Sequence, residues 1–247
     1  MNDFRAKAVL SRTLAIWGKH VIPFSVLSLV CFIPDFIVNV SYIVALQNGL
    51  RIPEWSFIAV STALACLLGL VVTSAVTYGT IQELRGRPAT LGETISVGLG
   101  RILGVLGTAI IAGLAICIGT ALLIIPGLVV SLTLFVAIPA AVVEKASSFG
   151  ALRRSAELTQ DHRVTIFAIV FWINLTERVV LKITEVLIAN GLAGSPTISK
   201  IIMYSLFEVA AIALLAPFAA VASAVVYHEL RRIKDGSDIE ALAAVFD

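Results

Sequence analysis

Six long apolar stretches, separated by short polar segments, dominate the chain. A helix rises about 1.5 Å per residue, so roughly 20 apolar residues cross a hydrocarbon layer about 30 Å thick. The pattern therefore predicts an all-α fold, a polytopic transmembrane helical bundle of about six spans that forms one integral membrane domain over residues 1–247. The expected spans cover residues 21–46, 57–82, 102–124, 127–143, 164–190 and 201–227.

The third and fourth spans are separated only by Pro126-Gly127. This pair stops one helix and reverses the chain, which predicts an antiparallel hairpin. A second turn is expected at Gly86-Arg87-Pro88, and the pattern Thr90-x-x-Glu93 predicts a capping box at the start of the following helix. Motifs of small residues such as Ala115-x-x-x-Gly119 predict helix contacts within the chain, with a homo-oligomer seam left open.

The composition supports a lipid environment. Apolar residues make up 59% of the chain, charged residues only 14%, and the mean hydropathy is +1.00. Soluble domains carry about a quarter charged residues, so the composition excludes an ordinary soluble enzyme. The first apolar stretch is too long for a cleavable signal peptide, and we expect it to remain as a span. Membrane lipids are the expected partners, and nucleic acid is not.

The basic residues define an orientation, because cytoplasmic loops carry an excess of Lys and Arg. Of the 18 basic residues, 14 fall before the first span, after the sixth, or in the loops that follow the second and fourth spans. Only Arg51 and Lys200 lie on the other side, and Arg178 and Lys182 lie within the fifth span. Both termini are therefore expected in the cytoplasm.

Two cytoplasmic segments, residues 3–20 and 147–163, have the pattern of short amphipathic helices that lie at the membrane interface. In the second segment, we expect an apolar face formed by Phe149, Leu152, Ala156 and Thr159; in the first, by Phe4, Leu10, Leu14 and Trp17. Basic residues near the cytoplasmic surface are expected to contact lipid headgroups. They are Arg153, Arg154, Arg163, Arg231 and Arg232.

Ionisable residues inside three spans are the main candidates for function, because a charge in the hydrocarbon layer needs a partner, water or a route to the headgroups. By helical rise, Asp35 and Arg178 lie at similar depths, about 20 Å from the cytoplasmic end, and Glu208 lies near the same level. We expect these three, with Glu177, to form a polar cluster that is either a site or a structural ion pair. Lys182 and Glu185 are close enough to the outer surface to reach it.

Several stretches resemble a known family. They run from Ile125-Pro126-Gly127-Leu128 through Glu144 and Ala151–Thr159 to Phe167, with Tyr227–Arg231 and Lys234-Asp235-Gly236 near the C-terminus. They are similar to the bacterial polytopic membrane-domain family associated with glycerophosphodiester phosphodiesterases (YciC-like inner-membrane proteins). The resemblance implies a six-helix module of the bacterial cytoplasmic membrane. The phosphodiesterase activity is not expected here, because its soluble catalytic barrel is missing from the sequence.

No catalytic, cofactor or metal motif stands out, so neither an enzyme nor a metal site is expected. Cys31, Cys66 and Cys117 lie far apart in apolar runs and without ligand spacing. Three functional classes remain open: a non-catalytic accessory or structural protein of envelope and lipid homeostasis, a transporter or channel for a small or amphiphilic solute, and a lipid-acting membrane enzyme. The intramembrane charges favour the second class, and the resemblance favours the first.

Overall fold

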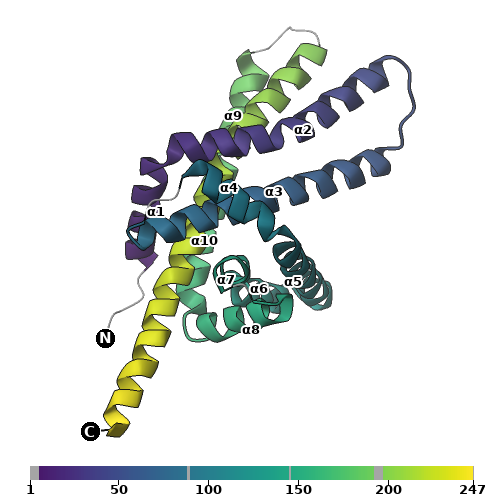
Figure 1. Cartoon of the computed structure of the whole chain (residues 1–247). Coiled ribbons are helices and arrows are strands. Elements are labelled where there is room, and N and C mark those ends of the chain that lie inside the picture. The colour runs from purple at the N-terminus through teal and green to yellow at the C-terminus, as the bar shows by residue number, and fades with distance from the viewer. Residues whose placement is uncertain (1–5, 88–89, 145, 192–196, 247) are drawn as a thin grey trace.

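The computed structural model describes residues 6–87, 90–144, 146–191 and 197–246, and every regular element within these ranges is a helix. Figure 1 shows how these helices are arranged. In chain order they are α1 (Ala6–Lys19), α2 (Val21–Gln47), α3 (Glu54–Leu84), α4 (Leu91–Gly100), α5 (Ile102–Leu122), α6 (Ile124–Thr133), α7 (Ala137–Glu144), α8 (Ser148–Thr159), α9 (Arg163–Gly191) and α10 (Thr197–Phe246).

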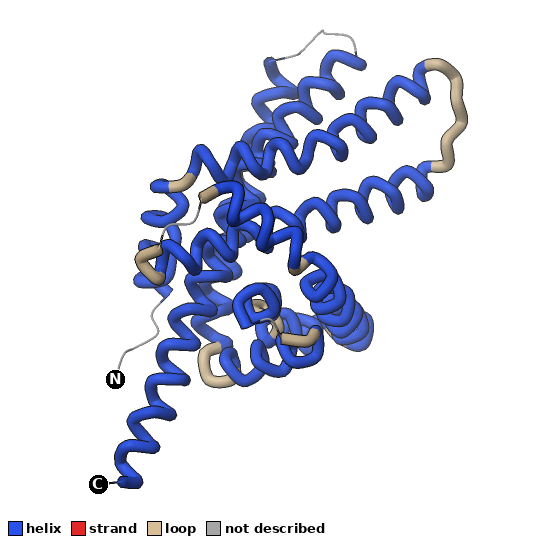
Figure 2. The backbone as a smooth tube through the Cα atoms, in the orientation of Figure 1, coloured by secondary structure: helices blue, strands red, loops and turns tan. Residues whose placement is uncertain are grey.

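Six long apolar segments match the six expected spans. Five of them lie in α2, α3, α5, α9 and α10, and the remaining one combines α6 with α7. The tube view in Figure 2 shows α2 and α3 as one antiparallel hairpin and α9 and α10 as another. The chain is therefore an all-α polytopic helical bundle. Helix α10, which holds the sixth apolar segment, is about 75 Å long and so much longer than a bilayer needs. It continues well past the expected end of the sixth span at residue 227.

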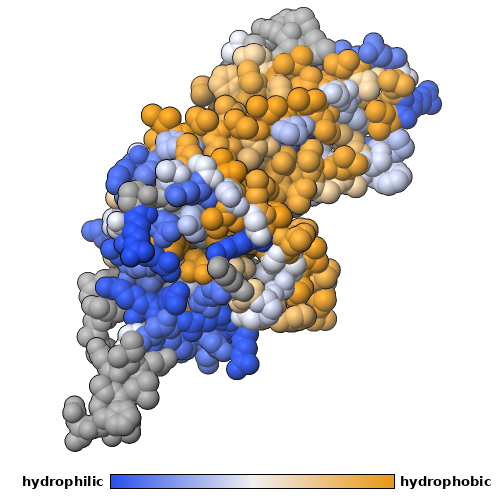
Figure 3. Space-filling view, viewed as in Figure 1, coloured by the Kyte–Doolittle hydropathy of each residue, from blue (hydrophilic) through white to orange (hydrophobic). Residues whose placement is uncertain are grey.

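Apolar and polar surfaces are segregated along the molecule. In Figure 3 an apolar surface covers the hairpin of α2 and α3, and hydrophilic residues gather at the other end, around α1 and α8. The start of α1 and the end of α10 lie at this same hydrophilic end in Figure 1. This arrangement agrees with the expectation that both termini share one side of the membrane.

Small residues of α10 form the centre of the bundle. Ala220, Val221, Ala224 and Val225 are fully or almost fully buried. Lipid tails are as apolar as leucine side chains, so helices in a bilayer associate through close packing rather than through burial alone. The small side chains allow α10 to pack closely against α2 and α3.

The reversal between α5 and α6 lies at Leu123, and the sequence-based position at Pro126-Gly127 is wrong. Leu123 is extended, with φ −163° and ψ 147°, while Pro126 lies in the first turn of α6. Proline is tolerated there because the N–H that it lacks has no intrahelical partner in a first turn. Gly127 instead provides close packing, since a Cβ at this position would lie 2.7 Å from the Cα of Thr120.

The fourth span is interrupted rather than continuous. Helix α6 ends at Thr133, and α7 starts at Ala137. The break leaves the carbonyl of Thr133 without its usual helical donor, and α8 provides two replacements. The hydroxyls of Ser155 and Thr159 donate to this oxygen over 2.7 Å and 3.1 Å. Helix α8 is thereby fixed to α6, which belongs to the fourth apolar segment.

Both expected short helices exist as α1 and α8, and the residues that each buries against the bundle are mostly not those of its expected apolar face. In α8 the buried residues include Ala151, Ser155 and Thr159, while Phe149 is 73% exposed. In α1 they are Val9, Thr13 and Ile16, while Leu14 is exposed; Phe4 lies outside the described residues. Each helix therefore has a face that packs on the bundle, and lipid contact by the expected apolar faces stays a prediction.

Two local predictions are confirmed. Thr90 accepts from the backbone N–H of Glu93, whose carboxylate accepts from the N–H of Thr90, which completes the capping box that starts α4. The turn after α3 contains Gly86 at φ 71°, a left-handed conformation that glycine adopts without a Cβ clash.

Candidate functional site

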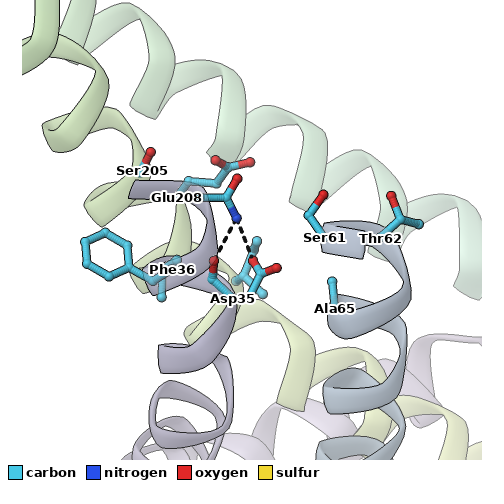
Figure 4. Close-up of a pocket in the computed structure, with 10 residues that line it drawn as sticks. Asp35, Phe36, Ser61, Thr62, Ala65, Ser205 and Glu208 are labelled. Atoms are coloured by element: carbon cyan, nitrogen blue, oxygen red, sulfur yellow. Dashed lines mark hydrogen bonds between the residues drawn. The ribbon is translucent and has the colours of Figure 1, made fainter. Parts of the chain in front are cut away.

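A pocket of about 240 Å³ opens among α2, α3 and α10, in the half of these helices that is distant from the polar end. Its lining combines two carboxyl groups with neutral oxygen and nitrogen groups and a few apolar side chains. The lining residues are Asp35, Phe36 and Asn39 of α2, Ser61, Thr62 and Ala65 of α3, and Ser205, Glu208, Val209 and Ile212 of α10. Figure 4 shows Asp35 and Glu208 facing the space in front of Ser61 and Thr62.

Asp35 is held in place by its own helix. Pro34, directly before it, lacks an N–H and so leaves the carbonyl of Val30 without a helical donor. One turn later, the Nδ2 of Asn39 donates to the backbone oxygen of Asp35 over 2.9 Å and to its Oδ2 over 3.2 Å (Figure 4). The other carboxylate oxygen, Oδ1, is buried and has no hydrogen-bond partner in the described structure. Its own helix therefore supplies a donor to only one of the two carboxylate oxygens of Asp35.

Glu208 approaches the pocket from α10, with Ser205 one turn before it on the same face. The carboxyl groups of Glu208 and Asp35 are near enough to interact electrostatically. Within the described residues, no ion pair joins either group to a basic side chain. Two carboxylates in a membrane repel each other unless a proton or a cation lies near both.

An aromatic pair lies between the pocket and the loop that joins α2 to α3. The rings of Tyr42 and Phe57 are stacked, with centroids 3.8 Å apart and planes 6° from parallel. Tyr42 is two helical turns beyond Asp35, and Phe57 is about one turn before Ser61, so each lies on the pocket-facing side of its helix. The stack joins α2 to α3 on the loop side of the pocket.

The expected cluster of Asp35, Arg178 and Glu208 forms only in part. The structure brings Asp35 and Glu208 into one pocket, whereas Arg178 does not line it and is exposed on α9. Glu177 is half-buried beside Arg178. Further along the helix, the Nζ of Lys182 lies 2.8 Å from Glu185 Oε1, and both side chains are exposed. Arg178, Lys182 and Glu185 of α9 thus face outward and not into the bundle or the pocket.

A second polar cluster joins helices at the polar end of the bundle. The hydroxyl of Tyr227 donates to Glu144 over 2.7 Å, and Arg154 donates to the same carboxylate over 3.2 Å. Arg154 also donates to Asp235 over 2.7 Å, and Arg231 donates to Asp235 over 3.0 Å. Burial lowers the pKa of the Arg154 guanidinium, but its bonds to Asp235 and Glu144 outweigh this and the net shift is upward. We call these five residues the polar-end network.

The network bears on the expected headgroup contacts. Arg154 and Arg231 have carboxylate partners within the protein, so their main contacts are structural. Arg153 is 84% exposed and pairs with Glu157 one turn away, and Arg232 pairs with Glu229. Arg163 has a buried Nε without a hydrogen-bond partner in the described structure. Headgroup contact stays a prediction for these arginines.

Sequence reasoning missed the neutral groups of the pocket. Asn39, Thr62 and Ser205 are ordinary polar residues in apolar helices, and no motif marks them. The available signal was helical spacing: Asn39 follows Asp35 by four residues, and Ser205 precedes Glu208 by three. The contribution of α3 had no such signal, because this helix carries no charge near Ser61.

Comparisons with known proteins add no identification. No family model, no curated protein and no solved structure matches the chain. The resemblance to the YciC-like membrane-domain family therefore stays a prediction. The fold and the pocket define a multi-pass helical membrane protein with an acidic pocket among three of its helices.

Proposed function

We propose that this protein binds and transports a small organic cation of the ammonium type, which enters the pocket from the outer side of the membrane. The observation that carries the proposal is the pair Asp35 and Glu208: two carboxyl groups in one membrane-embedded pocket, with no basic partner among the described residues. Of the three functional classes that the sequence left open, this pair favours the transporter.

The chemistry of the lining supports a cation. Two carboxylates can balance one positive charge, and the hydroxyls of Ser61, Thr62 and Ser205 add oxygen acceptors for N–H donors. Apolar groups from Ala65, Val209 and Ile212 suit the carbon substituents of an ammonium ion. A pocket of about 240 Å³ limits the ligand to a few heavy atoms.

Binding of radiolabelled methylammonium, which carries both N–H donors and a carbon substituent, to the purified protein in lipid nanodiscs tests the proposal. Glu208→Gln and Asp35→Asn should each weaken saturable binding about tenfold or more, because a charged contact contributes roughly 1.5–3 kcal/mol. Glu54→Gln, which removes an exposed carboxylate at the start of α3, is the matched control and should leave binding unchanged. Absence of saturable binding, or equal binding by all variants, contradicts the proposal.

A second candidate is the non-catalytic accessory or structural role in envelope and lipid homeostasis, in the bacterial cytoplasmic membrane that the family resemblance implies. The polar-end network favours this role. Its residues lie within the stretches that carry the resemblance, and they join α7, α8 and α10 rather than line a pocket. Under this alternative, neither the unaltered protein nor the Asp35→Asn and Glu208→Gln variants bind the cation detectably. Deletion of the gene then changes the lipid composition of the membrane.

A further inference from the structure

One straight stripe of residues, part of a broader exposed surface, runs along most of the transmembrane helix α9. It consists of Val164, Phe167, Phe171, Asn174, Arg178, Lys182 and Glu185, all of which are exposed. At about 100° per residue, these seven positions fall within roughly 80° of one another. The buried residues Ile166, Ile169, Ile173 and Ile188 point toward the bundle instead. We call the exposed set the α9 face.

The spacing along the α9 face is that of a helix–helix seam. The intervals from Val164 to Glu185 are three, four, three, four, four and three residues. Alternation of three and four is the pattern of a left-handed pair of helices that cross at about 20°, because it keeps one stripe directed at the partner. The same pattern is common where transmembrane helices associate.

The middle of the α9 face is too polar to face lipid alone. Asn174 lies about 16 Å from the start of the helix, near the centre of a hydrocarbon layer about 30 Å thick. Its Nδ2 donates to the Val170 oxygen over 2.8 Å, which leaves the amide oxygen and one N–H without a partner in the helix. Arg178 follows one turn later, exposed and without an ion pair among the described residues. Intramembrane charges almost always face protein or water, which favours a partner helix at this position.

The chemistry of the α9 face suits a second copy of the same chain. Two copies inserted in the same orientation place equal residues at equal depths, so a two-fold pair brings Asn174 opposite the Asn174 of the second copy. A primary amide is both donor and acceptor, and two amides can therefore satisfy one another. The charges of the outer half also balance, since Glu177 and Glu185 match Arg178 and Lys182. The same symmetry places Arg178 opposite the Arg178 of the second copy, and the two Glu177 carboxylates, at almost the same depth beside the stripe, offset the repulsion between the two arginines.

We propose that the protein forms a two-fold homodimer in the membrane through the α9 face, with the Asn174 pair at its centre. Such an interface is isologous, and the phenylalanines at positions 167 and 171 form its cytoplasmic half. Asn174 in a seam position would also fix the register and limit the assembly to one state. This inference is independent of the cation pocket, which lies among α2, α3 and α10.

Disulfide cross-linking in native membranes tests the dimer. In a variant in which Cys31, Cys66 and Cys117 are replaced by alanine, Phe171→Cys and Asn174→Cys should each give an oxidised dimer of the full-length chain. Ile183→Cys, exposed on the opposite side of α9, is the matched control and should stay monomeric. Equal cross-linking at position 183, absence of cross-links at both seam positions, or a cross-link to a different protein overturns the proposal.

A second measurement covers the possibility that cysteine variants do not fold. Dilution of fluorescently labelled protein in lipid bilayers gives the dimer association constant by energy transfer. Asn174→Leu should lower this constant roughly three- to thirtyfold, in line with measured interhelical hydrogen bonds. Thr176→Leu, on another side of the same helix, should not change it. A concentration-independent monomer, or an unchanged constant in Asn174→Leu, contradicts the proposal.

Discussion

Tyr227 of α10 donates its hydroxyl to Glu144 at the end of α7, over 2.7 Å and across 83 residues of sequence. Tyr227 is almost fully buried, and Arg154 of α8 donates to the same carboxylate. Three helices therefore meet at one carboxyl group, in the part of the molecule where the apolar bundle gives way to the hydrophilic end. We therefore expect the polar-end network to stabilise the packing of these three helices.

Removal of the tyrosine hydroxyl should destabilise the fold. In Tyr227→Phe, the ring remains but Glu144 loses one donor, and leaving a buried group without its hydrogen bond costs about 1–3 kcal/mol. We expect a lower apparent melting temperature of the purified protein in detergent. Tyr204→Phe, at an exposed position of the same helix, is the control and should have no effect. An equal shift in both variants would mean that the hydrogen bond to Glu144 is not the cause.

Two neighbouring arginines offer a matched comparison. Arg154→Gln removes an arginine whose side chain is 22% exposed and which pairs with two carboxylates, whereas Arg153→Gln removes one that is 84% exposed. The first change should cost about 1–3 kcal/mol, because it leaves Glu144 and Asp235 short of a partner. The second should cost less than about 1 kcal/mol, since exposed ion pairs contribute little. Reversible unfolding in mixed micelles measures both, and similar losses would contradict the difference in role.

Close packing in the α5–α6 hairpin should depend on one glycine and not on another. Gly127→Ala introduces a Cβ only 2.7 Å from the Thr120 backbone, so the two helices must separate, at a cost of about 1–3 kcal/mol. A Cβ at Gly113 meets no atom within 4 Å, and Gly113→Ala should be neutral or stabilising by up to about 1 kcal/mol. Thermal unfolding of both variants in detergent provides the comparison. Equal stability of the two variants would show that the hairpin tolerates a wider gap.

The expected topology can be measured directly. With the three native cysteines replaced, Arg51→Cys in the α2–α3 loop should react with a membrane-impermeant maleimide in intact cells. Gln160→Cys, after α8, should react only after the membrane is opened, because this side carries most of the basic residues. Both positions are exposed, so burial does not explain a difference in labelling. Labelling of Gln160→Cys in intact cells would reverse the assigned orientation.

Local sequence patterns determined which segments cross the membrane. Runs of about 20 apolar residues predict spans wherever they occur, and Thr90 and Glu93 predict a capping box because all its partners lie within one helical turn. The distribution of basic residues gave an orientation for the same reason, since it depends on the order of spans and not on their contacts. These features hold whatever the arrangement of the helices.

Only the tertiary structure decided which sides of the helices meet. Equal depth suggested a cluster of Asp35, Glu208 and Arg178, but the rotation of α9 turns Arg178 outward while α2 and α10 turn the two carboxyls inward. Spans that are apolar all round carry little amphipathic signal, and packing of small residues sets their rotation. No local pattern predicts long-range hydrogen bonds. Examples are the bond from Tyr227 to Glu144 and the bonds from the α8 hydroxyls to the Thr133 carbonyl. Depth can be counted along a sequence, whereas helix rotation is set by neighbours that the local sequence does not specify.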